Sequence, residues 1–295
     1  MRGLKKTGGE GAGGRILSRL ACLVLAAVLA LQVGFLLPAA AAAPPEQVLE
    51  DLQYRVNAWV IGGAARAGIV LKSLGEGRYQ ADLTVEPLGL LKIISGQRRD
   101  RFCTEMAYRH GRLVPLIYRE ESRKRGRLGL KEYRFDYDQG RLELWTFHEG
   151  KGMRRKWHTA LKKEPIYDPL SAFYNFRLGA MGPPKEGETL KAAGIPYPQP
   201  EEITVRVGSQ GQKGCKVMVS IINRVFDNEK GVIFVYFDGK WAPTQAWTRV
   251  LRVGKVEGII LPESKLLTRP LKEILAPQKE KLALQKGLEN FPQGW

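Results

Sequence analysis

Three histidines are the residues whose type best suits metal binding or acid–base chemistry in this sequence. His110 stands in a His-Gly turn, whereas His148 and His158 occur on neighbouring predicted strands and could meet, with Glu149 nearby. None of them belongs to a helical metal motif with two histidines. Outward-facing strand histidines explain the pattern better than a metal site does.

Carboxylate and phosphate chemistry find equally little support. Glu120 and Glu121 lie among arginines, which is typical of an exposed turn with salt bridges. Glycosidase carboxylates can be far apart in sequence, but no pair of acids stands out. The glycines of residues 9–14 match a dinucleotide fingerprint without the preceding strand that it needs, and no P-loop or nucleophile elbow occurs. We therefore expect no enzyme, no catalytic residues, no metal site and no cofactor.

The first 43 residues have the three parts of a secretory signal. Residues 1–19 carry five Lys or Arg and one acid, Leu20–Leu37 is apolar, and Ala39–Ala43 provides small residues for cleavage. The apolar stretch of 18 residues is barely long enough to span a bilayer, so the alternative is a retained membrane anchor. In both cases the basic flank places the remaining chain on the outer side. We expect export to the periplasm or cell envelope.

Beyond that segment the chain is strongly basic. Residues 44–295 contain 42 Lys or Arg and 29 Asp or Glu, a net charge of +13. Such a surface favours anionic partners. Outside the cytoplasm these are a lipid surface, a lipoprotein or an anionic envelope polymer rather than nucleic acid. A basic surface that is simply solvated is the alternative.

Basic residues also stand beside a tryptophan. Arg154, Arg155, Lys156 and Trp157 form a candidate anion or membrane-surface site, with Trp145 close by in the sequence. Indole rings and cations together suit the headgroup level of a membrane. The other interpretation is an edge strand protected by its charges.

Two cysteines follow the secretory segment, Cys103 and Cys215. An oxidising compartment allows them to form a disulfide. Two buried free thiols are the alternative interpretation.

Alternating apolar and polar residues predict a sheet protein. Tyr79–Glu86 and Glu132–Asp138 each alternate with a period of two, which indicates strands with one face in a core and the other in water. Asp238-Gly239 predicts a hairpin, and the short connections favour antiparallel pairing. We count about ten to twelve strands, at 52–60, 64–72, 78–86, 99–109, 112–121, 130–138, 141–148, 153–160, 202–208, 214–226, 231–238 and 245–261.

One short helix is predicted at about 168–178. Asp168 suits the N-cap, Pro169 the first helical position and Gly179 the C-terminus. A helix this short must pack on something apolar, for which the concave face of the sheet is the natural partner. The strand at 233–237 is apolar on both faces, so one face either is covered or lines a cavity. The candidate ligand-binding residues are therefore Phe173, Tyr174, Leu178, Phe234 and Tyr236.

These elements predict a mainly β fold, a large curved antiparallel sheet (half-barrel) with one central helix. The expected organisation is a signal peptide at 1–43, a β-rich domain at 44–262 and a polar helical or frayed tail at 263–295. Within the domain, the prolines of 180–200 indicate a loop or linker between two strand-rich halves.

Three stretches carry a resemblance to a known family. They are Tyr54–Val56 with Gly62–Ala65, then Tyr167–Tyr174 with Arg177 behind it, and Val235–Asp238 followed by Pro243. Over about residues 50–262 the chain resembles an exported bacterial family catalogued as domain of unknown function 3108. The resemblance implies an envelope location and kinship with lipoprotein-carrier half-barrels, in which a curved sheet wraps a short helix and binds acyl chains. It implies no catalytic residues.

Two functions remain open from the sequence, beside a hydrolase with dispersed carboxylates that no residue pattern nominates. The first is binding of a hydrophobic or amphiphilic envelope ligand in the concavity of the sheet. The second is a structural envelope factor that binds protein or acidic glycan through a basic face. Whether side chains fill the concavity distinguishes the two.

Overall fold

The structure is a computed structural model, and the residues that it describes are 46–58, 61–161, 165–195, 201–211, 214–220, 231–250 and 254–275. The predicted secretory segment at 1–43 lies outside the described residues, as do residues 276–295 of the predicted tail. No helix in the described ranges is long and apolar enough to cross a membrane.

In the described part of the chain, fifteen strands form one sheet, so the predicted mainly β fold with a curved antiparallel sheet is confirmed. The first half of the sheet is a meander of eight strands: β1 (Gln47–Ala58), β2 (Ile61–Gly75), β3 (Arg78–Pro87), β4 (Arg99–Arg109), β5 (Arg112–Lys124), β6 (Arg127–Asp136), β7 (Arg141–His148) and β8 (Gly152–Ala160). The second half contains β9 (Ile166–Tyr167), β10 (Thr189–Gly194), β11 (Glu201–Gly211), β12 (Gly214–Ser220), β13 (Val232–Phe237), β14 (Pro243–Val250) and β15 (Gly254–Ile260).

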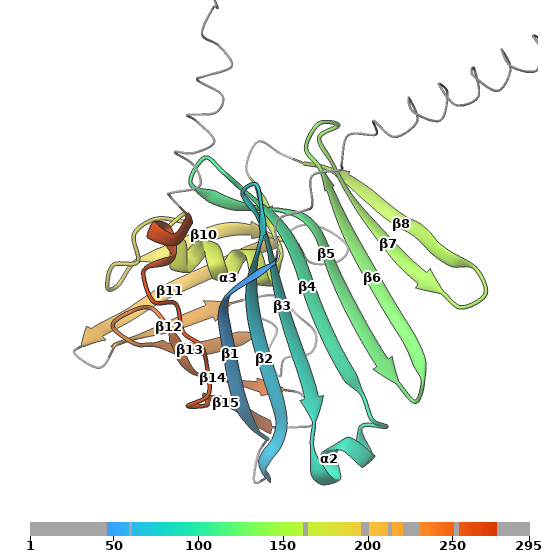
Figure 1. Ribbon diagram of the computed structural model, residues 1–295, viewed down its shortest axis with the longest axis horizontal. Helices are drawn as coiled ribbons and strands as arrows, with labels where there is room; N and C mark the ends of the chain where they lie inside the picture. Colours follow the sequence, from blue (N-terminus) through green and yellow to red (C-terminus); the bar gives the residue numbers. More distant parts are fainter. Residues whose placement is uncertain are drawn as a thin grey trace, which may run out of the picture. The chain divides into compact units, whose positions relative to one another are not determined.

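The two halves join where β1 pairs with β15, so the spatial order is β8 to β1 and then β15 to β9. Neighbouring strands are antiparallel except for β9 and β10, which run parallel. Figure 1 shows the central helix, α3 (Pro169–Leu178), between the two halves. A second helix, α2 (Gly89–Ile94), connects β3 to β4.

The alternation predicted for β3 is confirmed. Tyr79, Ala81 and Leu83 pack in the hydrophobic core beneath α3. Asp82 points to the opposite, outer face, where its carboxylate pairs with Arg101 of β4. Further ion pairs cross the outer face from β4 to β8: Arg119–Glu105, Arg119–Glu132, Arg134–Glu132 and Arg155–Glu143. One face of this half is therefore apolar and the other is charged, as expected for an antiparallel sheet with one solvated side.

Three clusters of buried residues hold the fold together. The first joins α3 to β2–β5 through residues such as Leu71, Met106 and Tyr174. The second joins the other side of α3 to β10–β13, with Phe176 and Val217 among its members. The third lies under β5–β8 and includes Ile166 of β9. Since α3 belongs to two of the clusters, it is the element that links the halves of the sheet.

The packed domain continues past the predicted boundary at 262. Asp51 of β1 forms backbone hydrogen bonds in both directions with Lys265. Residues 271–275 form a helical turn, and the side chains of Leu271 and Leu275 are buried in the first cluster. Two buried leucines are enough to fix this segment to the core. The overall polarity of residues 263–295 gave no indication of that packing.

Candidate hydrophobic ligand site

The N-terminus of α3 is fixed by a buried aspartate. Asp168 is the N-cap, and its carboxylate accepts hydrogen bonds from the backbone nitrogens of Leu170 (2.9 Å) and Ser171 (3.0 Å). The hydroxyl of Thr104 on β4 donates to the same carboxylate at 2.8 Å. Burial raises the pKa of Asp168 above its ordinary value, although these hydrogen bonds act in the opposite direction. The Asp-Pro start that the sequence predicted is thus also a link to the sheet.

The middle of α3 is tied to β5 by an amide side chain. Asn175 is buried, accepts from the backbone nitrogen of Leu113 at 2.9 Å and donates to the carbonyl of the same residue at 2.6 Å. The amide of Asn175 thus pairs with both the N–H and the C=O of Leu113, in the way that a neighbouring strand pairs with a residue of a sheet. At its C-terminus α3 ends with Gly179 in the left-handed conformation, with φ of 74°.

A buried ion pair holds the C-terminal half of α3 against β1. The guanidinium of Arg177 donates to both carboxylate oxygens of Glu50, at 2.6 and 2.8 Å, and its Nε donates to the carbonyl of Trp241 at 2.9 Å. The hydroxyl of Tyr174 also donates to Glu50, at 3.2 Å. Burial by itself lowers the pKa of Arg177, but hydrogen bonds to Glu50 and the charge of Glu50 raise it above its ordinary value. Both charges are therefore satisfied within the protein.

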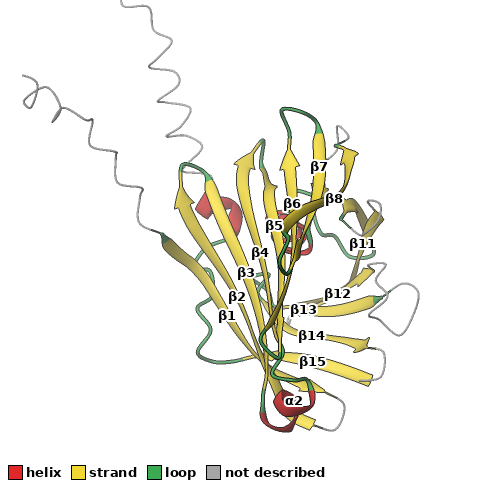
Figure 2. Ribbon diagram, turned by 90° about the vertical axis from the view of Figure 1, so that its right-hand side faces the viewer, coloured by secondary structure: helices red, strands yellow, loops and turns green. Residues whose placement is uncertain are grey.

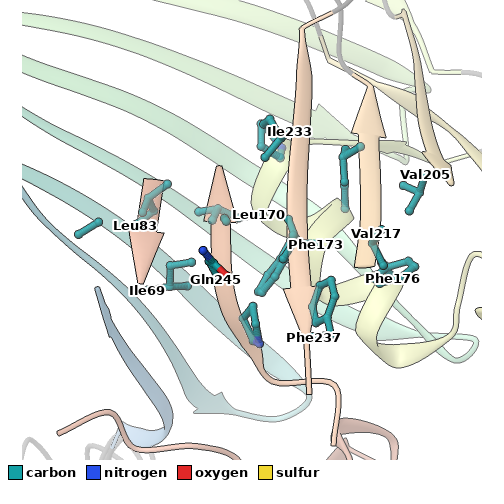
Figure 3. Close-up of a pocket in the computed structure, with 18 of the residues that line it drawn as sticks. Ile69, Leu83, Leu170, Phe173, Phe176, Val205, Val217, Ile233, Phe237 and Gln245 are labelled. Carbon is teal, nitrogen blue, oxygen red and sulfur yellow. The ribbon is translucent and has the colours of Figure 1, made fainter. Parts of the chain in front are cut away.

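The helix and the two halves of the sheet enclose a cavity of about 360 Å³. Phe173 and Phe176 of α3 line it together with Phe237 of β13, and the ring centroids of Phe173 and Phe176 lie 6.4 and 5.5 Å from that of Phe237 (Figure 3). The lining from the sheet comprises Tyr54, Val56, Ala67, Ile69, Leu83, Ile203, Val205, Val217, Val219, Ile233, Val235, Pro243, Gln245, Ala246 and Gly258. The lining is therefore almost entirely hydrocarbon.

Polar groups in this lining are already engaged. The side-chain nitrogen of Gln245 donates to Glu257 at 2.8 Å, and the hydroxyl of Tyr54 donates to the carbonyl of Pro243 at 2.9 Å. Arg177 stacks beneath the ring of Phe173, 5.3 Å from its centroid, but its donors are taken up by Glu50 and Trp241. The cavity can accept apolar groups, whereas a charged headgroup would find no binding partner among these side chains.

Several lining residues are incompletely buried. Ile69, Leu83, Phe173, Ile233 and Val235 all have intermediate exposure, although they lie on the concave side of the sheet. By contrast, the side chains that form the three clusters are buried. The protein's own side chains thus leave part of the concavity beside Phe173 unpacked.

The structure separates the five ligand-binding residues predicted from the sequence. Phe173 lines the cavity, while Tyr174 and Leu178 point to the first cluster and are buried there. The prediction that Phe234 and Tyr236 face the concavity is wrong. Both stand on the outer face of β13, where the ring of Trp247 stacks on each, at 5.0 and 5.4 Å.

The reason for this error is the strand's period of two. Ile233, Val235 and Phe237 point inward, so a shift of one residue exchanges the two apolar faces of β13. The outer face tolerates apolar residues because its aromatic rings stack on one another and are partly shielded from water. The ammonium of Lys216 also lies over the ring of Phe234, 4.6 Å from its centroid. Phe237 is the residue of the sequence that could have assigned the faces. It ends the strand just before the Asp238 turn, and it shares a face with Val235 because the two are two residues apart.

The basic cluster on β8 does not form one surface. Arg155 lies on the outer face and pairs with Glu143 at 3.0 Å. Trp157 packs on the inner side against the third cluster, with its ring edge toward Tyr133. Arg154 is opposite Thr146, and a register shift between Leu144 and Trp145 accompanies this pairing. This register shift places Trp157 and Arg155 on opposite faces, although residues two apart in a regular strand share a face.

The cysteines are not paired in the structure. Cys103 and Cys215 are both free and buried. Cys103 is opposite Asp82 on the outer face of β4, whereas Cys215 belongs to the second cluster on the inner face of β12. Burial raises the pKa of Cys103 to about 12 and also raises that of Cys215. The candidate disulfide is therefore contradicted by the placement of the two thiols on opposite faces.

The histidines are dispersed. His110 occupies a turn with positive φ, His148 is opposite Gly152 and His158 is opposite Glu143. His148 and His158 consequently lie at different levels of the β7–β8 pair. Within the described ranges, no group of three or more His, Cys, Asp or Glu could hold a metal ion.

Comparisons with known proteins bear on the family. No curated protein matches the chain. A solved structure, the crystal structure of a beta-barrel-like protein of domain of unknown function DUF1849 from Brucella abortus, is similar with 12% sequence identity and a TM-score of 0.35, covering 75% of this chain and 98% of that chain. The model of the family described as protein of unknown function (DUF3108) matches residues 53–213, more than half of the sequence. The chain therefore belongs to the DUF3108 family.

Proposed function

We propose that this protein binds or carries a hydrophobic or amphiphilic ligand in the cavity beside α3, and that it does so as a binding protein rather than as an enzyme. The observation that carries the proposal is the cavity of about 360 Å³ with an apolar lining whose side chains are incompletely buried. Small-molecule sites measure about 300–1,000 Å³ and are lined mainly by apolar side chains. A concavity serving only as a core would be filled to the density of the three clusters.

The chemistry of the lining narrows the ligand class. Transfer of hydrocarbon from water into such a cavity is favourable, by about 0.8 kcal/mol for each buried CH₂. Since Gln245 and Tyr54 already have partners, a polar headgroup gains nothing inside. The expected ligand is therefore an acyl chain or similar hydrocarbon, with any headgroup outside the cavity.

The secretory pattern of residues 1–43 supports the proposal that this binding takes place outside the cytoplasm, in the periplasm or cell envelope. Lipids and lipoproteins are the envelope molecules that combine hydrocarbon with a polar headgroup. The basic balance of the chain suits anionic headgroups of such ligands. A structural factor that binds protein or acidic glycan through its basic face is the alternative that the experiments below test.

Replacement of Phe173 by Ala separates the two functions. Phe173 contacts Tyr174 and Phe237 but also faces the cavity, so its ring should contribute both to stability and to the binding wall. For a ligand site, we expect the variant to bind a fluorescent acyl-chain probe more weakly while its denaturation midpoint falls modestly. For a closed core, truncation of a large aromatic should cost about 3–5 kcal/mol.

The assay titrates the probe into the parent protein and Phe173→Ala, and measures urea denaturation of both. Tyr236→Ala on the outer face of β13 is the matched aromatic control and should retain probe affinity. Strong destabilisation of Phe173→Ala, together with no probe binding by the parent protein, would reject the binding function and favour the structural one.

A further inference from the structure

The short helix α2 is an exposed apolar element at the end of β3 and β4. None of its residues is buried, and the side chains of Leu90, Ile93 and Ile94 are 63%, 75% and 68% exposed. Leu88, which precedes the helix, is 40% exposed. Figures 1 and 2 show α2 projecting at this end of the sheet. We call Leu88, Leu90, Ile93 and Ile94 the apolar tip.

Packing within the chain does not account for the tip. The helix has six residues and no side-chain cap, and helices of this length have little stability of their own in water. Leu88 is held by one backbone hydrogen bond to Ala64, and the last turn closes on Ser95 and Gly96. The sheet thus anchors the backbone of α2 while leaving its large side chains in solvent, where single exposed leucines are common but a group of four indicates an interaction.

Positive charge surrounds the tip. The stretches 86–100 and 121–127 together contain seven Lys or Arg and three Asp or Glu. They are adjacent in space because β4 pairs with β5 up to Arg99 and Arg123, and because the nitrogen of Arg125 donates to the carbonyl of Gly96 at 3.1 Å. The bases that form this basic rim are Lys92, Arg98, Arg99, Arg123, Lys124, Arg125 and Arg127.

The acids of the rim neutralise part of this charge. Glu86, Asp100 and Glu121 each pair with one arginine of the rim, at 3.7, 2.9 and 2.7 Å. Within the described residues, no acid lies at ion-pair distance from the remaining bases: Lys92, Lys124, Arg125 and Arg127. Four cations next to four exposed aliphatic side chains therefore remain available to an anionic surface.

We propose that α2 docks the protein on an anionic lipid bilayer, with Leu90, Ile93 and Ile94 inserted below the headgroups and the basic rim against the phosphates. An aliphatic tip that projects, with cations at its base, matches the apolar and polar levels of a bilayer interface. A protein partner would need an apolar groove bordered by acidic residues to bind this surface. An anionic bilayer presents a hydrocarbon layer beneath charged headgroups over its whole area. This surface lies on a different strand pair from the Arg154–Trp157 cluster considered from the sequence.

The position of the tip relates it to the cavity. Leu83 lines the cavity and stands on β3, five residues before Leu88. At about 3.3 Å per strand residue, the Cα atoms of Leu83 and Leu88 lie within about 17 Å of each other. Docking through α2 would thus hold the ligand site near the membrane, although the docking itself does not depend on any ligand in the cavity.

An environment-sensitive label at residue 93 tests the docking directly. The full chain carries Cys22→Ser and Ile93→Cys labelled with a nitrobenzoxadiazole dye. Cys103 and Cys215 are buried, so we expect them to react slowly with the dye. We expect the emission to shift to the blue and gain intensity with phosphatidylglycerol-containing vesicles, but not with pure phosphatidylcholine. The dye reports the surroundings of residue 93, so attachment of the chain through residues 20–37 does not by itself produce the signal.

Two controls make the result specific. The same label at Leu266, another exposed apolar residue, should not respond to vesicles. The variant Lys92→Glu/Lys124→Glu/Arg127→Glu should need at least about tenfold more anionic lipid for half of the signal, because each base near the surface contributes several-fold in affinity.

The charge-matched variant Arg206→Glu/Lys240→Glu/Arg249→Glu changes three exposed bases elsewhere and should behave nearly as the parent protein. An unchanged signal at residue 93 with anionic vesicles would overturn the proposal. So would an equal loss in both triple variants, which would indicate general attraction by net charge. A response to polyglutamate without a response to vesicles would assign the tip to an acidic protein and also overturn it.

Discussion

Replacing Arg177 by Met tests the buried ion pair that fixes α3 to β1. The substitution keeps the length and apolar stem of the side chain but removes both hydrogen bonds to Glu50 and the one to Trp241. Glu50 is completely buried, so its carboxylate would be left without a countercharge. Removing one partner of a buried pair costs about 3–5 kcal/mol. Since domains are stable by about 5–15 kcal/mol, the variant should lose a large part of its free energy of unfolding.

The double variant Glu50→Leu/Arg177→Met should be less damaged than Arg177→Met alone, because no uncompensated charge remains. The hydroxyl of Tyr174 then lacks its acceptor, a loss of about 1–3 kcal/mol for a buried polar group. Urea denaturation followed by tryptophan fluorescence gives the free energies, and the double-mutant cycle should show a coupling of about 2 kcal/mol or more between the two residues.

Lys131→Met supplies the matched control, because Lys131 pairs with Glu120 at 2.8 Å and the Lys131 side chain is 52% exposed. An exposed ion pair contributes about 0–1 kcal/mol, so this variant should unfold almost as the parent protein does. If Arg177→Met costs no more than Lys131→Met, or if the cycle shows no coupling, the buried ion pair does not stabilise the contact of α3 with β1.

Three further predictions concern the surroundings of α3 and the rest of the core. Asp168→Ala removes the cap and the acceptor of a buried threonine hydroxyl on β4, so it should cost about 3 kcal/mol in urea denaturation; a cost below about 0.5 kcal/mol would contradict the capping role. In a Cys22→Ser chain, Cys103 and Cys215 should react slowly with a disulfide reagent at pH 8 while folded, because burial raises both pKa values and thereby lowers the thiolate fraction, and both should titrate after unfolding without reductant; a disulfide found by mass spectrometry would oppose this. Leu275→Ala should cost about 2–5 kcal/mol because the side chain is buried, whereas a solvated tail would tolerate it.

Local patterns in the sequence predicted the elements around the site well. The Asp168 cap, the Pro169 start and the Gly179 end of α3 are each determined by a few neighbouring residues, and all three are found. Strand alternation also assigned the inner and outer residues of β3, because one of its faces is polar. These are features for which the immediate chain contains the whole physical cause.

Features that depend on distant partners were not predictable in the same way. β13 is apolar on both faces, so the pattern alone could not show that Val235 faces the cavity while Tyr236 stacks on Trp247. β10 lies inside the proline-rich stretch interpreted as a linker, and its pairing with β11 supplies the order that its own sequence does not. The pairing of Glu50 with Arg177 joins residues more than a hundred positions apart and left no local signal.

The apolar tip illustrates a third limit. α2 is six residues long, between Leu88 and Ser95, which is too short for helical periodicity to separate it from a loop or a strand. Its sequence, Gly-Leu-Leu-Lys-Ile-Ile, is that of a small core element. Only the placement of β3 and β4 shows that Ile93 and Ile94 are exposed.

Binding of an acyl-chain probe to a pair of tryptophan variants on β13 tests the central claim most directly. Val235 lines the cavity and Tyr236 points outward, so Val235→Trp fills the site whereas Tyr236→Trp places the same indole side chain on the other face. We predict saturable binding to the parent protein and to Tyr236→Trp, and loss of binding in Val235→Trp with the fold retained by circular dichroism. Failure of the parent protein to bind, or equal binding by Val235→Trp, would contradict a hydrophobic ligand site in this cavity.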